Sequence, residues 1–538
     1  MFSFWYFCRI IIDIFTVISR MQTFEMVAKT FQGLEDVLAE ELRDLGALNV
    51  EPGLRMVSFE GDLEMLYKAN LCCRTALRIL KPIYKFIADT PDALYEGVKE
   101  FEWSKVLSPD KTFAIDTVAN SEEFTHSRFV TYRVKDAIVD WFRDRLGPDV
   151  RPGVRLQDAD VMINVHISGE RVTLSLDSSG ESLHKRGYRV AQTEAPINEV
   201  LAAGIILKSG WRGDCPLVDP MCGSGTFLIE AAMIATGTYP GIYRRRFAFE
   251  SWPDFDAELF DSIYNDDSQE RTFTHRIIGA DISPKAIAIA RENIKSAGMM
   301  KYIDLEVKPL ARWEEAPADG VLITNPPYGE RISVDDMEGL YALLGSKLKH
   351  VFGGYHAWII GYREEYFHKI GLAPSVKMPL LNGSLECELR EYIIFDGNMR
   401  DFRSEGGKLK GDRAGADRKP KFRYKSDEKW AADARRSGMG GKEHRSADKG
   451  RKLSALEERY HAGNRQDRKK DRKERREISR EEFSENPLAR RRNEAALKSL
   501  IGRKPSLPKS EGPMMRPRRG WKRPGAQGNQ GAENDNNE

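Results

Sequence analysis

The most informative run in this sequence has an amide side chain, two prolines and an aromatic residue. It is Asn325-Pro326-Pro327-Tyr328, which follows the apolar segment 320–324. Because proline lacks a backbone N–H and has a fixed φ, two in succession leave backbone carbonyls free to face a ligand. Asn325 adds an oxygen acceptor and Tyr328 a flat surface. The run therefore suits an exocyclic amine on a nucleobase; a structural Pro-Pro turn, the alternative, explains neither the asparagine nor the tyrosine.

A second group of residues forms a glycine-rich turn after an acidic residue. Asp219 is followed by Pro-Met-Cys-Gly-Ser-Gly-Thr at 220–226, between a predicted strand and a predicted helix. Glycines allow close backbone approach to a ligand, and the start of a helix offers free N–H groups. The turn lacks the spacing of a dinucleotide or phosphate loop. The acidic residue suits the cationic end of an amino acid, and a tight structural turn is the alternative.

A third group places a carboxylate at the end of the next predicted strand. Asp281 stands in the sequence Gly-Ala-Asp-Ile at 279–282. A carboxylate at this position of a doubly wound sheet accepts the hydroxyls of a ribose. A helix cap is the alternative, because Ser283-Pro284 follows and proline favours a helix start. Two acids at the ends of successive strands favour the nucleoside interpretation.

Taken together, three segments resemble a known family. DPMCGSGTF, GADIS and NPPYGER resemble class I S-adenosylmethionine-dependent methyltransferases of the N-P-P-[YF] type, which methylate exocyclic amines. The runs 179–189 (SGESLHKRGYR) and 195–199 (APINE) are similar to the bacterial 23S ribosomal RNA guanine-N2 methyltransferases. These carry a ferredoxin-like segment and a THUMP RNA-binding domain before the catalytic domain. The resemblance covers Met21 to about Arg400 and is to the unfused type, since no second methyltransferase domain follows.

The resemblance implies roles for particular residues. The catalytic corner would be formed by Asn325, Pro326, Pro327 and Tyr328. The methionine end of S-adenosylmethionine would be bound by Asp219, Gly223, Gly225 and Thr226, with Cys222 packed in the turn rather than acting as a nucleophile. Asp281 would bind the ribose and Ile282 one face of the adenine. Where the family usually has an acidic contact to the adenine amine, this chain has Lys308-Pro309-Leu310, so that contact is absent or is made by the backbone.

The implied reaction is methyl transfer to the N2 amine of a guanine. Two acceptors, the Asn325 side-chain oxygen and the Pro326 carbonyl, would take the amine hydrogens and free the nitrogen lone pair. Tyr328 would stack on the base after it has left its helix. Neither a metal nor a covalent nucleophile is required. Transfer to a transfer RNA guanine or an adenine N6, and a non-catalytic RNA-binding assembly role, remain alternatives.

The expected partner is 23S ribosomal RNA before its assembly, with no membrane contact. Candidate phosphate contacts are basic residues in a predicted helix and in the run 184–189: Arg128, Arg133, Lys135, Lys185, Arg186 and Arg189. The alternatives are a solvated helix face and a solvated linker turn. The oligomeric state is not predicted.

The hydrophobic pattern predicts an α/β protein: a Rossmann-like methyltransferase domain after an α+β ferredoxin-like and THUMP region. In the amino-terminal part we expect helices over 33–46, 63–80 and 127–146, and a hairpin over 161–177. From Pro196, strands alternate with helices, as in a parallel sheet covered on both faces. The expected domains are 21–62 (ferredoxin-like), 63–177 (THUMP), 178–400 (methyltransferase) and 401–538 (a disordered basic tail).

Charge is distributed unevenly along the 538 residues. Residues 401–538 carry a net charge of +16 and residues 1–400 a net charge of −14. A basic tail attracts RNA without reading its sequence, although a merely solvating tail is the alternative. The six cysteines form no C-x-x-C pair, which indicates a reducing, cytoplasmic setting. Residues 1–20 are expected to be an over-long start, with a membrane anchor as the alternative.

Overall fold

The fold is described from a computed structural model. It describes residues 22–156, 158–327, 334–383 and 385–395. The predicted tail, the first twenty residues and Tyr328 lie outside these ranges. Within them, two β-sheets carry the fold, one of eight strands and one of seven. No helix in these ranges combines the length and apolar character that a membrane span requires.

The first sheet contains all the strands before residue 178. These are β1 (Phe24–Lys29), β2 (Leu48–Gly53), β3 (Met56–Gly61), β4 (Arg78–Ile87), β5 (Thr112–Asn120), β6 (Gly153–Val154), β7 (Val161–Ser168) and β8 (Arg171–Asp177). Their spatial order is β2-β3-β1-β4-β8-β7-β5-β6. Only β5 pairs in parallel, with β7 and β6. The predicted hairpin over 161–177 is confirmed as β7 and β8.

Strand β4 is where the sequence prediction was wrong. The helix predicted over 63–80 is α3 (Leu63–Cys72), which ends because Cys73 adopts an extended conformation. The following residues form β4, whose beginning pairs with β1 and whose remainder pairs with β8. Its partners lie tens of residues away, so local periodicity did not reveal it. The ladder is irregular between Pro82 and Tyr84, as expected where proline removes a donor.

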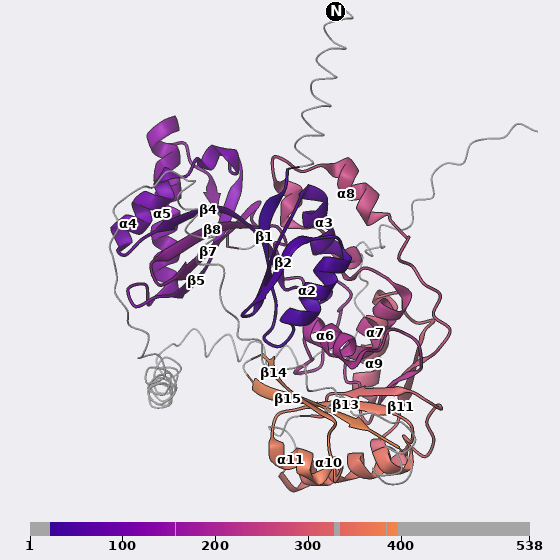
Figure 1. The fold of residues 1–538 in the computed structure, drawn as a ribbon. Helices are drawn as coiled ribbons and strands as arrows, with labels where there is room; N and C mark the ends of the chain where they lie inside the picture. Colours follow the sequence, from indigo (N-terminus) through magenta and orange to yellow (C-terminus); the bar gives the residue numbers. More distant parts are fainter. Residues whose placement is uncertain (1–21, 157, 328–333, 384, 396–538) are drawn as a thin grey trace, which may run out of the picture. The chain divides into compact units, whose positions relative to one another are not determined.

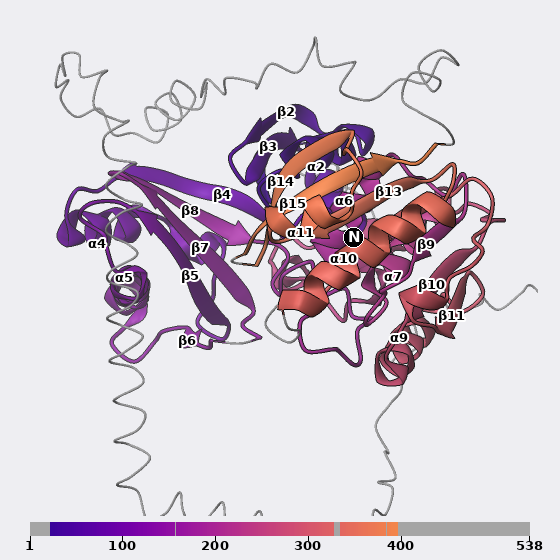
Figure 2. The same ribbon diagram turned by 90° about the horizontal axis from the view of Figure 1, so that it is seen from below.

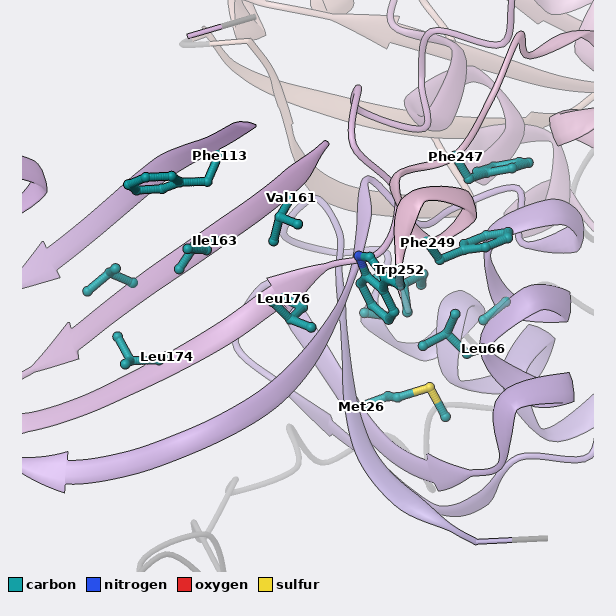
Figure 3. Packing of buried hydrophobic residues seen from close by; sticks show 14 of the residues in the cluster. Met26, Leu66, Phe113, Val161, Ile163, Leu174, Leu176, Phe247, Phe249 and Trp252 are labelled. Carbon is teal, nitrogen blue, oxygen red and sulfur yellow. The ribbon is translucent and has the colours of Figure 1, made fainter. Parts of the chain in front are cut away.

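Helices pack on this sheet and complete its core. They are α2 (Glu35–Asp44), α3, α4 (Pro91–Glu100), the short η1 (Trp103–Lys105) and α5 (Ser127–Leu146). α5 has the predicted bounds and buries Val130, Val134 and Ile138. The same core takes in aromatic residues from a later segment: Figure 3 shows Phe247, Phe249 and Trp252 in one cluster with Met26 and Leu66. The amino-terminal region and the later segment therefore share buried apolar surface.

The second sheet has the alternating strand–helix pattern that the sequence predicted. Its strands are β9 (Leu217–Asp219), β10 (Ile277–Asp281), β11 (Ile303–Val307), β12 (Val321–Thr324), β13 (His356–Gly361), β14 (Val376–Asn382) and β15 (Leu385–Ile393). Their order is β11-β10-β9-β12-β13-β15-β14. The first five strands pair in parallel, and β15 is antiparallel to both of its neighbours. The α/β fold class is confirmed.

Helices cover both faces of this sheet (Figure 1). α6 (Glu199–Ser209), α7 (Thr226–Thr236) and α9 (Pro284–Ser296) share one core with the strands, and α10 (Val334–His350) and α11 (Glu364–Lys369) share the other. Figure 2 shows α10 laid over the second sheet. Shorter elements are η2 (Pro240–Tyr243), η3 (Ala248–Ser251), α8 (Ala257–Tyr264) and η4 (Leu310–Arg312). The packing of helices on both faces of the sheet fixes the positions of the strand ends.

Candidate active site

Three of the predicted residues lie at the carboxyl ends of neighbouring strands. Asp219 ends β9, Asp281 ends β10, and Asn325 follows β12 directly. β9 lies between the other two strands. Gly279 of β10 pairs with Asp219 of β9, and Leu322 of β12 pairs with Val218 of β9. The strand order reverses between β9 and β12, and ligands of open α/β sheets bind outside such a reversal. The fold thus brings the three predicted groups to one edge.

Asp219 is a buried carboxyl group tied to β12. It is 1% exposed, and the Thr324 hydroxyl donates to its Oδ1 at 2.8 Å. The Met221 N–H donates to the same oxygen at 3.1 Å. Burial raises the pKa of Asp219 to about 7, against the opposite effect of these two donors. Both donors use Oδ1, so among the described residues Oδ2 retains the capacity to accept a hydrogen bond from a ligand group.

Asp281 holds the glycine turn in place. Its Oδ2 accepts the Gly223 N–H at 3.0 Å, and its Oδ1 accepts the Ser283 N–H at 2.8 Å. Each carboxylate oxygen can accept a further hydrogen bond. The helix-cap alternative belongs to Ser283 instead, whose hydroxyl accepts the Ala286 N–H at the start of α9. Asp281 can therefore support the turn and still accept ribose hydroxyls.

The two glycines of the turn serve different purposes. Both have positive φ, 54° at Gly223 and 81° at Gly225. A Cβ at Gly225 would lie 3.2 Å from the Ala290 side chain of α9, so this glycine permits close helix packing. A Cβ at Gly223 would meet nothing within 4 Å. Gly223 thus faces open space.

The first turn of α7 completes this side of the site. Thr226 begins the helix, no side chain caps it, and no acidic residue lies in its first turn. Such a helix start attracts the carboxylate of an amino acid. Cys222 is 7% exposed, and burial raises the pKa of its thiol well above the usual range. A protonated, buried thiol is consistent with packing and not with nucleophilic attack.

Residues predicted to flank the adenine differ in exposure. Ile282 is 73% exposed, unusual for a large apolar residue, and it directly follows Asp281. Leu310, by contrast, is 5% exposed and packs in the core with Val218 and Leu322. The Leu310 side chain is therefore enclosed in the core, and Ile282 is the more accessible of the two.

The acceptor corner follows β12 without a break. Asn325 is half-buried, Pro326 is buried and Pro327 is exposed. Thr324, the residue before Asn325, is bonded to Asp219, so the corner and the cofactor side share one hydrogen bond. The two prolines contribute no N–H donors here. The corner can therefore present oxygen acceptors beside Asp219.

Comparisons with known proteins agree with this geometry. A family model described as "RMKL-like, methyltransferase domain" matches residues 186–391. A "THUMP domain" model matches residues 88–177, and an "RlmL ferredoxin-like domain" model matches residues 25–80. A putative RNA methyltransferase of Synechocystis is 37% identical over 371 residues, which cover 68% of this chain and 96% of that protein.

The chain belongs to the RMKL-like methyltransferase family. The resemblance predicted from the motifs is confirmed. The ribosomal RNA large subunit methyltransferase K/L of Syntrophotalea carbinolica is 42% identical, over 68% of this chain and 52% of that protein. The chain thus spans about half the length of the K/L relatives that it matches. A putative methyltransferase crystallised with SAH has a TM-score of 0.63 and 33% identity, over 70% of this chain and 100% of that one.

Arg186, one of the arginines predicted to bind RNA, is buried inside the fold. Arg186 is 2% exposed, and its guanidinium donates to the Leu183 and Arg74 carbonyls and pairs with buried Glu230. A side chain so enclosed cannot reach a phosphate, so this prediction was wrong. Its partners are distant in the sequence, which is why the basic run was misleading.

Arg189 is placed against the glycine turn. It donates to Glu199 Oε1 at 2.6 Å, to the Ser224 hydroxyl at 3.0 Å and to the Thr226 hydroxyl at 2.8 Å. These bonds hold the turn from the linker that precedes α6. Sequence reasoning assigned Arg189 to RNA and missed this positioning role. Lys185 of the same run is exposed and pairs with Glu181.

The basic residues of α5 that were predicted to bind RNA differ in how far other parts of the fold occupy their side chains. Arg133 is occupied by the Pro91 carbonyl and by Asp92, and it lies 4.4 Å from the Tyr95 ring. Lys135 pairs with Asp136. Arg128 is exposed and has no ion pair within the described ranges. The sequence reasoning missed two exposed aromatic residues beside Arg128 on this helix: Phe129 and Tyr132, 51% and 56% exposed.

Proposed function

We propose that this protein transfers a methyl group from S-adenosylmethionine to the exocyclic N2 amine of a guanine in 23S ribosomal RNA. The observation that supports this most is the hydrogen bond between Thr324 and Asp219. It links the acceptor corner to the cofactor side at the reversal point of a methyltransferase sheet. Family membership and the names of the K/L relatives support the same reaction and the same class of RNA.

The residues present fit S-adenosylmethionine. Asp219 would bind its ammonium group, the N–H groups at the start of α7 its carboxylate, and Asp281 its ribose. The open space beside Gly223 and the exposed Ile282 leave room for the ligand and an apolar surface for its adenine. When bound, this cofactor supplies an electrophilic methyl group on a positively charged sulfur.

The acceptor corner activates the amine. The lone pair of the guanine N2 nitrogen is delocalised into the ring, which makes the amine a poor nucleophile. The Asn325 side-chain oxygen and the Pro326 carbonyl would accept its two hydrogens and favour a tetrahedral nitrogen. The lone pair would then point at the methyl carbon; as the nitrogen–carbon bond formed, the methyl–sulfur bond would break to leave the thioether S-adenosylhomocysteine, and the amine would lose one proton to solvent. Correct positioning lowers the barrier by several kcal/mol, ~7 in favourable cases. Fixed acceptors also stabilise the charge that develops on nitrogen.

The region before residue 178 would hold the RNA. It matches a THUMP model, and α5 presents Arg128 with two exposed aromatic residues, a combination that suits unpaired bases and phosphates. The basic segment 401–538 would add affinity without sequence preference.

Identification of the methylated nucleoside tests the proposed function. The full-length protein is incubated with methyl-labelled S-adenosylmethionine and an unmodified 23S transcript, and the RNA is digested to nucleosides for mass spectrometry. We expect the label in N2-methylguanosine. Transfer RNA and 16S transcripts serve as matched substrates and should remain unlabelled.

Other outcomes separate the alternatives. Label in N6-methyladenosine would replace the guanine assignment, and preferential labelling of transfer RNA would replace the substrate. Calorimetry with S-adenosylmethionine gives an independent reading, since a non-catalytic assembly factor would show no saturable binding.

A further inference from the structure

A tyrosine and an arginine that no motif singles out lie one strand away from the acceptor corner. β12 and β13 pair in parallel, with Thr324 opposite Ile359. β12 ends at Thr324 and β13 ends at Gly361, so Asn325 and Tyr362 directly follow two neighbouring parallel strands. Paired strands are about 4.8 Å apart. Tyr362 therefore stands beside the corner at the carboxyl edge of the sheet.

Asn325 and Tyr362 are each spaced two residues from side chains that lie on the same face of the second sheet. Ile323 of β12 and Trp358 and Ile360 of β13 belong to the core that contains α6 and α7. Side chains alternate between the faces of a strand with a period of two residues. Asn325 is two residues beyond Ile323, and Tyr362 is two residues beyond Ile360. The alternation of the two strands, continued past their ends, would put both side chains on one side of the sheet.

The Tyr362 ring is open to solvent on this edge. It is 42% exposed, whereas Tyr366 and Phe367 of the following helix are 6% and 2% exposed. Its one recorded partner in the described part of the chain is the Arg363 guanidinium, 5.7 Å from the ring centroid. Packing of α11 therefore does not account for this aromatic residue, and one of its faces remains available.

Arg363 supplies a positive charge beside Tyr362 that can pair with an anionic group of a ligand. Arg363 is exposed, and no ion pair involving it is recorded in the described ranges. The acidic residue that follows, Glu364, is within 3.4 Å of Arg390 and 3.6 Å of Lys377. These two cations offset part of its charge, since Arg390 also pairs with Glu388 and Glu365 follows in the same helix. Within the described ranges, Arg363 itself has no acidic partner and lies next to an exposed ring.

We propose that Tyr362 and Arg363 form a second RNA contact of the active site, which holds the nucleotide adjacent to the methylated guanine. The neighbouring base stacks on Tyr362, and Arg363 pairs with its phosphate. A target base must leave its stack to reach the acceptor corner, and stacking of its neighbour offsets part of that cost. This inference rests on the proposed function and identifies where the single-stranded substrate is held.

The test uses the full-length protein with an unmodified 23S transcript and S-adenosylmethionine. Tyr362→Ala should raise the KM for RNA about tenfold, the loss expected for one stacked base. kcat at saturating RNA and the Kd for S-adenosylmethionine should stay within about twofold, because Tyr362 touches neither the cofactor nor the amine. Tyr362→Phe, which keeps the aromatic face, should restore the KM.

Arg363→Ala provides an independent measurement. It should weaken RNA binding and lower the slope of log affinity against log salt by about one, as expected for one lost phosphate contact. Met300→Ala is the matched control, since Met300 is 41% exposed and lies just before the amino end of β11. Melting temperatures of all variants exclude misfolding as the cause.

The outcomes distinguish this inference from the proposed function. If the wild-type protein methylates the transcript and Tyr362→Ala behaves like Met300→Ala, the second contact is refuted and the enzymatic function stands. A Tyr362→Phe variant as impaired as Tyr362→Ala would also refute stacking. If the wild-type protein neither binds S-adenosylmethionine nor methylates RNA, the proposed function itself fails.

Discussion

The cofactor edge of the second sheet and the exposed face of α5 are built in opposite ways. At the cofactor edge, backbone and side-chain groups of the turn are held by other parts of the fold: Asp281 accepts from the Gly223 N–H, Arg189 donates to the Ser224 and Thr226 hydroxyls, and the Asn293 amide donates to the Ser224 carbonyl. On α5, Arg128, Phe129 and Tyr132 point into solvent.

This difference fits the two ligands that we propose. A small cofactor with an electrophilic methyl group needs fixed donors and acceptors, because misplacement by about 1 Å costs much of the rate. A large RNA can be held by exposed side chains that become ordered only when the RNA binds. The comparison predicts that substitutions at the edge affect the cofactor, whereas those on α5 affect RNA alone.

The largest effect is expected at Asp281. Asp281→Ala removes the acceptor of two backbone N–H groups and the proposed ribose contact, so the Kd for S-adenosylmethionine should rise about a hundredfold or more. Calorimetry measures it. Asp304→Ala is the control, since this exposed carboxylate on β11 pairs with Arg276 at the surface. Equal Kd values for the two variants would contradict the role of Asp281.

A smaller effect is expected at Arg189. Arg189→Ala leaves the Ser224 and Thr226 hydroxyls without their donor and should raise the Kd for S-adenosylmethionine about tenfold. Arg291→Ala, an exposed arginine on α9, is the matched control. If Arg189→Ala instead weakened RNA binding and left cofactor binding unchanged, the original assignment to RNA would be restored.

Cofactor binding should depend on pH through Asp219. Below its pKa of about 7 the carboxyl group is protonated and loses the negative charge that attracts the ammonium group. The Kd for S-adenosylmethionine should therefore rise as pH falls below about 7, by up to tenfold per pH unit, and level off above it. Titrations between roughly pH 5.5 and 7.5 measure it.

Asp219→Asn sharpens this prediction. The amide cannot ionise, so the variant should bind weakly at every pH and lose the acid dependence. Burial raises the pKa of Asp219 above its ordinary value. Ionisation of this group therefore lowers the free energy of unfolding of the wild-type protein as pH rises from about 4 to about 7. The variant should therefore melt above the wild-type protein at pH 8. A pH profile unchanged in the variant would exclude Asp219 as its origin.

The smallest effect is expected on α5. The double variant Phe129→Ala, Tyr132→Ala should weaken binding of the 23S transcript by roughly fivefold. The Kd for S-adenosylmethionine should not change. Filter binding of RNA and calorimetry with the cofactor separate the two effects. A loss of cofactor affinity in this variant would remove the distinction between the two regions.

Much of the site was predictable because its residues follow a local rule. Asp219, Asp281 and Asn325 each come directly after an apolar strand, and parallel strands end at one edge. The same locality explains why α5 was predicted with the observed bounds, since its apolar residues recur at helical spacing.

The features that could not be predicted from the sequence depend on partners that are distant in the chain. β4 is a strand because β1 and β8 pair with it, and the apolar run from α3 concealed it. Arg186 and Arg189 look like a basic RNA-binding run until Glu230, Glu199 and Thr226 are placed around them. Tyr362 belongs to no motif, and it is relevant to the corner because it follows β13, the strand next to β12 in the sheet.

The most direct test is the single-turnover rate of Asn325→Ala at saturating S-adenosylmethionine and 23S transcript. Loss of one fixed acceptor should slow methyl transfer about a hundredfold or more, while the Kd for S-adenosylmethionine stays within about twofold of the wild-type value. A rate close to that of the wild-type protein would show that the amine is not activated at the Asn325-Pro326 corner.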